Sequence, residues 1–198
     1  MGELFNRLSR KANIEFHSIL FGVITMLNAL YARSIGVKLV GKVSFRGWTS
    51  FFRAANSDIQ IGKNCVFNSS GYTNHIGLNH RCIITTMDKN ARIMIGDGTG
   101  MSSTTITSWK SIMIGENVRI GANCIIMDGD FHLDDYRIGL PRAIIVERNV
   151  WLGANVVVMK GVCIGENSII GSNSIVTKDI PANCIAAGNP CRVIKQIL

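Results

Sequence analysis

The carboxy-terminal half of the chain has aliphatic residues at intervals of six. A small or β-branched residue follows four positions after each of the first five, and the pattern continues to Val176. Neither the 3.6-residue period of an α-helix nor the alternation of a simple strand produces this spacing. The aliphatic positions are Val146, Leu152, Val158, Ile164, Ile170 and Val176, and the smaller residues are Val150, Val156, Val162, Ser168 and Ser174.

Each hexapeptide predicts a short strand, a sharp bend and a corner that holds a small side chain. Three of them would close one triangular coil of about 18 residues, and stacked coils would bury the aliphatic ladder. The same register occurs at Ile114, Ile120 and Ile126, whereas earlier positions such as Ile83 and Ile95 keep it with gaps. We therefore predict an all-β solenoid over residues 55–188, in a domain of residues 55–198 with a short carboxy-terminal extension.

Residues 1–54 form a separate amino-terminal segment and lead-in. Residues 4–33 are rich in Leu, Ile and Phe and almost free of glycine, which predicts a helix. Residues 16–32 carry no formal charge, and Arg7, Arg10 and Lys11 precede them. Three readings stay open: a helix packed on the domain or on a neighbouring subunit, an interfacial helix at an anionic membrane, and a membrane-spanning helix.

The charge and cysteine content of the chain indicate which class of partner and which cellular compartment to expect. The chain has 21 Lys and Arg against 13 Asp and Glu, a net charge of +8 that suits a polyanionic partner. It has no pattern typical of a nucleic-acid-binding motif, so we expect no nucleic acid partner. The six cysteines contain no C-x-x-C pair, which favours reduced thiols in a cytoplasmic protein.

The regular spacing breaks between Ile126 and Val146, where the intervening residues are polar and typical of turns. In a solenoid such an insertion becomes a surface loop, and loops on a rigid scaffold often carry the chemistry. His132 lies in this loop, residues 128–142, with carboxylates on both sides. Imidazole titrates near neutral pH, so His132 is a candidate general base.

Four segments carry a more specific signal: residues 149–155 (NVWLGAN), 160–165 (KGVCIG), 170–179 (IGSNSIVTKD) and 187–194 (AGNPCRVI). They resemble the hexapeptide-repeat O-acetyltransferases that act on maltose, galactosides and capsular or O-antigen sugars. The resemblance is close over residues 110–196 and loose over 55–110. It implies a left-handed parallel β-helix, acetyl-CoA as the acetyl donor, and a homotrimer with active sites between subunits.

The resemblance also implies roles for single residues. His132 would take the proton from the acceptor hydroxyl, which then attacks the thioester directly. Asp130 would orient the imidazole, although Asp128, Asp134 and Asp135 compete for that role. The residues expected to bind the cofactor are Trp151 near its arm, Gly153, Ala154, Ser172 and Thr177 beside the pantetheine, and Arg192 and Lys195 at the phosphates.

Two other functions compete with acetyl transfer. His75 and His80 have the H-x-x-x-x-H spacing of zinc ligands in γ-class carbonic anhydrases, but the only histidine upstream is His17, in the helical segment, so we expect no metal. A catalytically silent scaffold would not need His132 in the loop. The acceptor we favour is a hydroxyl of a sugar or glycan precursor, reached from the cytoplasm at the inner face of the membrane.

Overall fold

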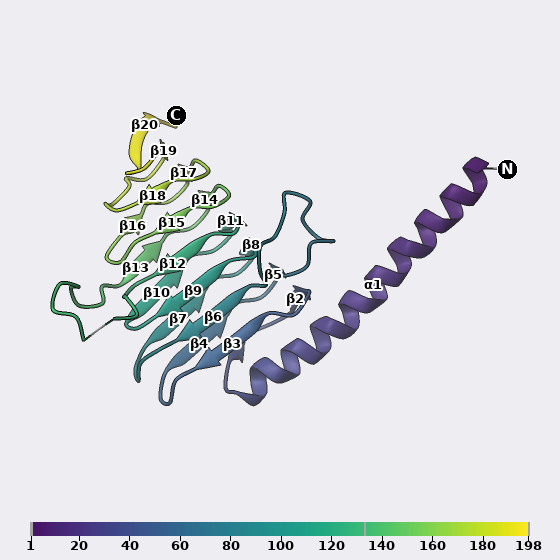
Figure 1. Ribbon diagram of the computed structural model, residues 1–198, viewed down its shortest axis with the longest axis horizontal. Coiled ribbons are helices and arrows are strands. Elements are labelled where there is room, and N and C mark those ends of the chain that lie inside the picture. Colours follow the sequence, from purple (N-terminus) through teal and green to yellow (C-terminus); the bar gives the residue numbers. More distant parts are fainter. Residues whose placement is uncertain (1, 133, 198) are drawn as a thin grey trace.

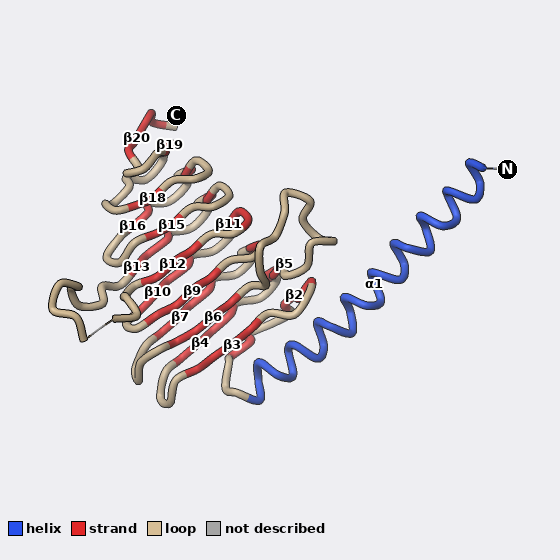
Figure 2. Tube along the Cα trace, viewed as in Figure 1, coloured by secondary structure: helices blue, strands red, loops and turns tan. Residues whose placement is uncertain are grey.

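The computed structural model describes residues 2–132 and 134–197, with side chains from Glu15 onward. One long helix, α1 (Gly2–Ser34), leads into a three-sided stack of short strands. Successive strands pass from sheet to sheet, and each pairs in parallel with the strand of the next coil (Figures 1 and 2). The described chain is therefore an α-helix followed by a parallel β-helix.

Three sheets form the sides of the prism. Sheet A contains β1 (Lys38–Leu39), β4 (Asp58–Ile61), β7 (Arg92–Ile95), β10 (Ser111–Ile114), β13 (Ile144–Val146) and β16 (Cys163–Ile164). Sheet B contains β2 (Val43–Arg46), β5 (Cys65–Asn68), β8 (Gly100–Ser102), β11 (Arg119–Ala122), β14 (Trp151–Leu152), β17 (Ile169–Ile170), β19 (Cys184–Ala187) and β20 (Arg192–Gln196). Sheet C contains β3 (Ser50–Arg53), β6 (Ile83–Thr86), β9 (Thr105–Ser108), β12 (Ile125–Met127), β15 (Val157–Val158) and β18 (Ile175–Val176).

The aliphatic ladder fills the prism as the hexapeptide spacing predicts. All six aliphatic positions from Val146 to Val176 are at most 1% exposed, and Ser168 and Ser174 are fully buried at the corners. Ile145 pairs with Cys163, 18 residues later. The predicted coil length is confirmed in this region.

Asparagine makes the turns. Asn149, Asn155, Asn167 and Asn173 have φ values of 58–60°, a left-handed conformation that asparagine adopts at lower cost than most residues. Their side chains also stack from coil to coil: Asn149 Nδ2 donates to Asn167 Oδ1 at 3.0 Å, and Asn155 Nδ2 donates to Asn173 Oδ1 at 3.1 Å. Each corner is therefore fixed by its backbone conformation and by the coil above it.

The β-helix begins earlier than residue 55. Strands β1, β2 and β3 form its first coil and lie within the segment that the sequence placed in the lead-in. Val43 of this coil pairs with Cys65, 22 residues later. Because 22 is not a multiple of six, the first coil has no hexapeptide register for a periodicity search to find.

Helix α1 closes the amino-terminal end of the prism. Ala32 is fully buried in the core, and the Tyr31 ring stacks on Trp48 with centroids 5.4 Å apart. Beyond the prism the helix continues away from the strands (Figure 1). At the other end, β20 turns back antiparallel to β19, which forms the expected carboxy-terminal extension.

Candidate active site

Residues 128–142 leave the prism between β12 and β13, at the corner where sheet C meets sheet A. Asp128 anchors the first residue of this loop and is fully buried. Its carboxylate accepts hydrogen bonds from the Ser108 hydroxyl at 2.7 Å and from the backbone N–H groups of Trp109, Lys110 and Ser111 at 2.6, 3.0 and 2.6 Å. A buried carboxylate with four donors is well satisfied, so it ties the loop to the turn of the preceding coil.

Lys160, on the following coil, holds the loop from the other side. Its ammonium donates to Asp130 Oδ2 at 2.5 Å and to the Gly139 carbonyl at 2.8 Å, and only 17% of its side chain is exposed. Asp130 is therefore bound to Lys160, and no contact with the imidazole of His132 accompanies it among the described residues. A cation on the adjacent coil therefore reaches the Asp130 carboxylate, and the role of Asp130 in orienting His132 stays a prediction.

His132 lies in the outer part of this loop and is exposed. Phe131 beside it meets Trp109 edge to face, with ring centroids 4.9 Å apart. Asp135 donates its N–H to the His132 carbonyl at 3.0 Å, and hydrogen bonds from Arg137 hold the pKa of the Asp135 carboxyl below its usual value. Of the competing carboxylates, Asp128, Asp130 and Asp135 are engaged with other groups, so Asp134 is the one for which no partner is described.

The predicted cofactor residues lie on both sides of sheet C. Gly153, Ala154 and Ser172 share the corner between sheets B and C, where Ala154 donates its N–H to Ser172 Oγ at 3.2 Å. A Cβ on Gly153 would lie 2.6 Å from the Ser172 nitrogen, so only glycine allows this close stacking. Thr177 follows β18, at the other corner of sheet C, and its place beside the pantetheine stays a prediction.

Trp151 and the two cations lie apart from that corner. The Trp151 side chain is 50% exposed on sheet B, pairs across the strands with Arg119, and lines a hollow with Asn149 and Ile169. Arg192 and Lys195 are exposed on β20. One copy of the chain therefore does not bring His132 and all the predicted cofactor residues into one cavity.

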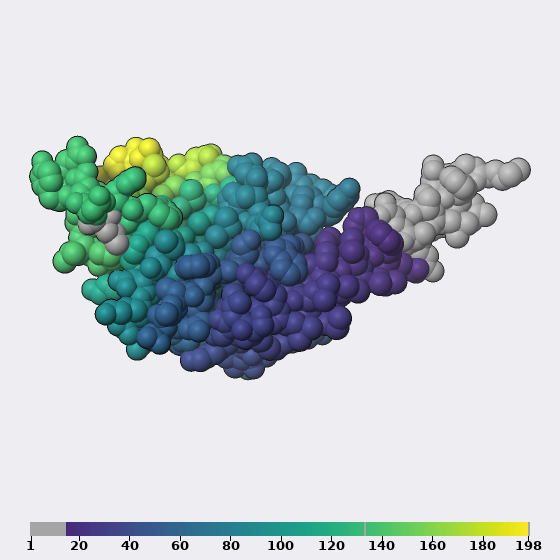
Figure 3. Space-filling view, turned by 60° about the horizontal axis from the view of Figure 1, so that its bottom comes forward, coloured from purple at the N-terminus to yellow at the C-terminus, as the bar shows by residue number. Residues whose placement is uncertain are grey.

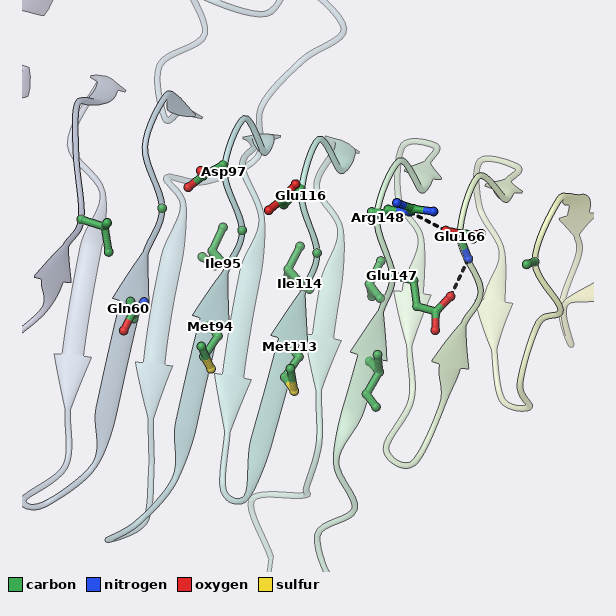
Figure 4. Close-up of a pocket in the computed structure, with 17 residues that line it drawn as sticks. Gln60, Met94, Ile95, Asp97, Met113, Ile114, Glu116, Glu147, Arg148 and Glu166 are labelled. Carbon is green, nitrogen blue, oxygen red and sulfur yellow. Dashed lines mark hydrogen bonds and ion pairs between the residues drawn. The ribbon is translucent and has the colours of Figure 1, made fainter.

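A larger groove, of about 780 Å³, runs along the outer face of sheet A (Figure 4). Its floor includes Met94 and Met113, which pair on neighbouring strands, and carboxylates lie along its rim. The acidic side chains are Asp97, Glu116, Glu147 and Glu166, and Arg148 is bound to Glu166 at 2.5 Å. It contains none of the predicted site residues, and its acidic rim is unsuited to the phosphates of a coenzyme.

A second loop, residues 69–82, leaves the prism between β5 and β6, so the loop of His132 is one of two large breaks. It folds back on the next coils: Asn123 Nδ2 donates to the Gly77 carbonyl at 3.1 Å, and His80 donates its N–H to Ser103 Oγ at 3.1 Å. His75 is exposed in this loop. Among the described residues, no group of three or more His, Cys, Asp or Glu side chains could hold a metal ion.

The anchoring residues Asp128, Trp109 and Lys160 were not identified from the sequence. Their partners are 17 to 30 residues away along the chain and become neighbours only in the stacked coils. One signal was available: Arg142 and Lys160 are 18 residues apart, one coil length, and Arg142 Nη2 donates to the Lys160 carbonyl at 3.1 Å.

Comparison with known families identifies the repeats. Residues 143–178 match the family model "Bacterial transferase hexapeptide (six repeats)", and residues 111–129 match "Hexapeptide repeat of succinyl-transferase". These ranges contain the strands in which the hexapeptide register is regular. The repeat architecture predicted from the sequence is confirmed.

Curated proteins with similar sequences include galactoside O-acetyltransferases. The chain is 35% identical over 146 residues to a galactoside O-acetyltransferase of Lactococcus lactis, covering 70% of this chain and 63% of the relative. It is 40% identical over 93 residues to the galactoside O-acetyltransferase of Escherichia coli, covering 47% and 45%. The chain thus spans about half to two thirds of the length of these relatives. The resemblance to hexapeptide-repeat O-acetyltransferases is confirmed.

Solved structures show the same fold. A hexapeptide-repeat acetyltransferase from Vibrio cholerae in complex with acetyl coenzyme A superposes with a TM-score of 0.54 at 23% identity, covering 94% of this chain and 90% of that chain. An N-acyltransferase from Bacillus cereus superposes with a TM-score of 0.61 at 20% identity, covering 85% and 89%. The fold is the left-handed parallel β-helix of these transferases, and it serves both O- and N-acyl transfer.

Proposed function

We propose that the protein transfers an acetyl group from acetyl-CoA to a hydroxyl of a sugar or glycan precursor, with His132 as general base. The observation that carries this proposal is the position of His132, exposed on a loop that Asp128, Lys160 and Trp109 fix to the β-helix. The similarity to galactoside O-acetyltransferases supports the reaction and the class of acceptor. A base held on a rigid support suits proton transfer at a fixed distance.

The reaction needs no covalent intermediate with the protein. The imidazole of His132 takes the proton of the acceptor hydroxyl as its oxygen forms a bond to the acetyl carbonyl carbon. The carbon–sulfur bond of the thioester then breaks, and the proton passes from His132 to the departing sulfur of CoA. The products are an acetyl ester and free CoA thiol.

The same proposal includes a homotrimer with active sites between subunits. In one copy, His132 and Thr177 lie at one corner of sheet C, and Gly153, Ala154 and Ser172 lie at the other. A neighbouring prism placed against this face would present a second set of groups to His132. Trp151, half exposed on sheet B, would be available to the cofactor arm or to the neighbour.

The test is turnover of acetyl-CoA with a panel of hydroxyl acceptors, read as release of CoA thiol. We expect His132→Ala to lower kcat by about 10²–10⁴-fold, the usual contribution of a general base, while calorimetry shows unchanged acetyl-CoA binding. His75→Ala is the matched control, because His75 is exposed on the other extruded loop. Equal turnover by His132→Ala and the wild type would remove His132 as the base. Absence of thiol release with every hydroxyl acceptor, together with release to an amine, would replace the proposed acceptor.

A further inference from the structure

Helix α1 uses one face to close the prism. Thr25 Oγ1 donates to the Phe45 carbonyl and accepts from the Phe45 N–H, both at 3.0 Å. The Asn28 side chain bonds the N–H and the carbonyl of Thr49 at 2.9 and 3.0 Å, and the Tyr31 hydroxyl donates to the Phe51 carbonyl at 2.9 Å. The polar side chains at positions 25, 28 and 31 therefore satisfy backbone groups of the first coil that have no preceding coil to pair with.

The opposite face of the same helix carries large apolar side chains that nothing covers in the described chain. They recur at intervals of three and four, which places them in one stripe along the helix. The members of this apolar stripe and their exposures are Phe16 62%, Ile19 70%, Leu20 39%, Val23 46%, Met26 57%, Leu27 48% and Leu30 57%. In Figure 3 the described part of α1, in purple, lies at the surface at the amino-terminal end of the β-helix.

The charges around the stripe favour a lipid surface as its partner. A helix that pairs with another helix in water normally flanks its apolar seam with charged residues, whereas residues 16–32 contain none. Basic residues follow the uncharged stretch at Arg33, Lys38 and Lys42, all of them exposed, although Lys38 is ion-paired with Asp58 at 2.9 Å. Arg7, Arg10 and Lys11 precede it in the sequence, and so do Glu3 and Glu15, which leaves both flanks net positive. An apolar face bounded by cations suits the boundary between acyl chains and anionic headgroups.

The packing of α1 also decides how it would meet the membrane. By length and composition alone, residues 15–34 could cross a bilayer. The face with Thr25, Asn28 and Tyr31 is bonded to the backbone of the β-helix, and these polar contacts could not be placed among acyl chains without losing their partners. A helix held along one side by a water-exposed domain can lie in the interface but cannot pass through it.

We propose that α1 lies in the plane of an anionic membrane, with the apolar stripe buried at the acyl boundary and the β-helix held above the headgroups. This binding does not depend on the proposed reaction. It would bring the site close to acceptors embedded in the same surface. Subunits related by an axis along the prism would present their α1 helices at one end, which would strengthen binding through multivalency.

The test is flotation of the full-length protein with vesicles of phosphatidylcholine alone or with added phosphatidylglycerol. We expect binding to the anionic vesicles and much weaker binding to the neutral ones. Val23→Glu/Leu30→Glu should lower the partition coefficient by about tenfold or more, because two charges would enter the apolar boundary. Ser18→Glu/Gly22→Glu is the matched control, since it adds the same charge at exposed positions off the stripe and should keep most of the binding.

Circular dichroism and mass measurement in solution accompany each variant, and Val23→Ser/Leu30→Ser replaces the glutamate pair if that pair does not fold. Wild-type protein that stays unbound to anionic vesicles would overturn the proposal. Equal flotation of the stripe variant and the wild type would do the same. A stripe variant whose assembly mass falls while its flotation is unchanged would assign the stripe to a second copy of the chain. Flotation is read without substrate, so failure of the proposed reaction would leave this result intact.

Discussion

The first and last coils of the β-helix fill the same prism with different side chains. In the first coils the sheet B and sheet C strands have four residues, and Val43 pairs with a residue 22 positions later. Phe45, Phe51 and Phe67 fill this region, with ring centroids 5.9 and 5.2 Å from Phe45. From β14 to β18 the strands have two residues, partners are 18 positions apart, and Val, Leu and Ile fill the core.

The difference follows from the perimeter of the coil. A coil of 22 residues encloses a wider triangle than one of 18, so aliphatic side chains alone would leave voids, and close packing then requires aromatic rings. The first coil also has no coil before it, and α1 supplies the missing hydrogen bonds through side chains. Regular coils are held by repetition, and the first coils are held by specific contacts.

The largest loss of stability should come from removing a buried aromatic side chain from the first coils. Phe67→Ala removes a fully buried ring and should lower the free energy of unfolding by about 3–5 kcal/mol, because the surrounding prism relaxes only in part. Urea denaturation followed by circular dichroism measures the change. Phe52→Ala is the matched control, since this ring on the neighbouring sheet is 58% exposed and should cost far less. Similar losses from both substitutions would mean that aromatic filling does not set the stability of the first coils.

This contrast also explains how far the sequence could predict the fold. From Val146 to Val176 each aliphatic residue lies where the spacing predicts, because coils of constant length keep one register. Earlier, the spacing selects Ile83, whereas the fully buried residue is Ile84. The period of six fails there because coil length changes, and neither the start at Lys38 nor the role of Asn28 can be derived from it.

The candidate site also contains features that the sequence predicts and features that it does not. The break in the repeat locates the loop and His132, since an insertion is visible in the spacing itself. The partner of Asp130 could not be predicted, because Lys160 becomes its neighbour only when two coils stack. Nor could the sequence predict that Thr177 lies at a different corner from Gly153, because the two-residue strand β18 spans a whole side of the prism. The period of six predicts where a residue lies within one coil. Predicting which residues meet on neighbouring coils also requires the pairing of the strands, which the period does not give.

The second prediction compares the stability contributed by the contacts of α1 with the first coil and by the stacked asparagine side chains of the regular coils. Asn28→Ala would leave the buried N–H and carbonyl of Thr49 without partners, and should cost about 2–6 kcal/mol because each such group costs about 1–3 kcal/mol. Asn167→Gly is the matched change in the regular coils. It removes two exposed ladder bonds, from Asn149 and to Asn183, and keeps a residue suited to φ of 59°, so it should cost about 1 kcal/mol. Thermal and urea unfolding measure both. A larger loss from Asn167→Gly would contradict the view that repetition, more than any single contact, holds the regular coils.

The smallest effect concerns two buried cysteines, Cys65 at the corner between sheets A and B and Cys124 at the corner between sheets B and C. Cys65 and Cys124 each follow a left-handed asparagine, and their sulfurs lie 3.3 and 3.1 Å from the carbonyls of Gly96 and Gly153 on the next coil. Burial raises the pKa of both thiols from 9.0 to about 11. The folded state therefore keeps its thiol proton at pH values where the unfolded chain has lost it, so stability is full below pH 9 and falls as the pH rises toward 11.

Each thiol should contribute about 2 kcal/mol to that fall by pH 11, since the shift is about two pKa units at about 1.4 kcal/mol each and the folded thiol is only half ionised at that pH. Urea unfolding of the wild type, Cys65→Ala and Cys124→Ala at pH 8 and at pH 11 isolates the two contributions, because lysine and tyrosine titrate alike in all three. Both variants should lose the same part of the pH dependence, one in the first coils and one at the turn between β11 and β12. A pH dependence that only one variant reduces would show that the two thiols do not have the same pKa shift. The size of the coil would then affect the pKa even where each cysteine follows a left-handed asparagine.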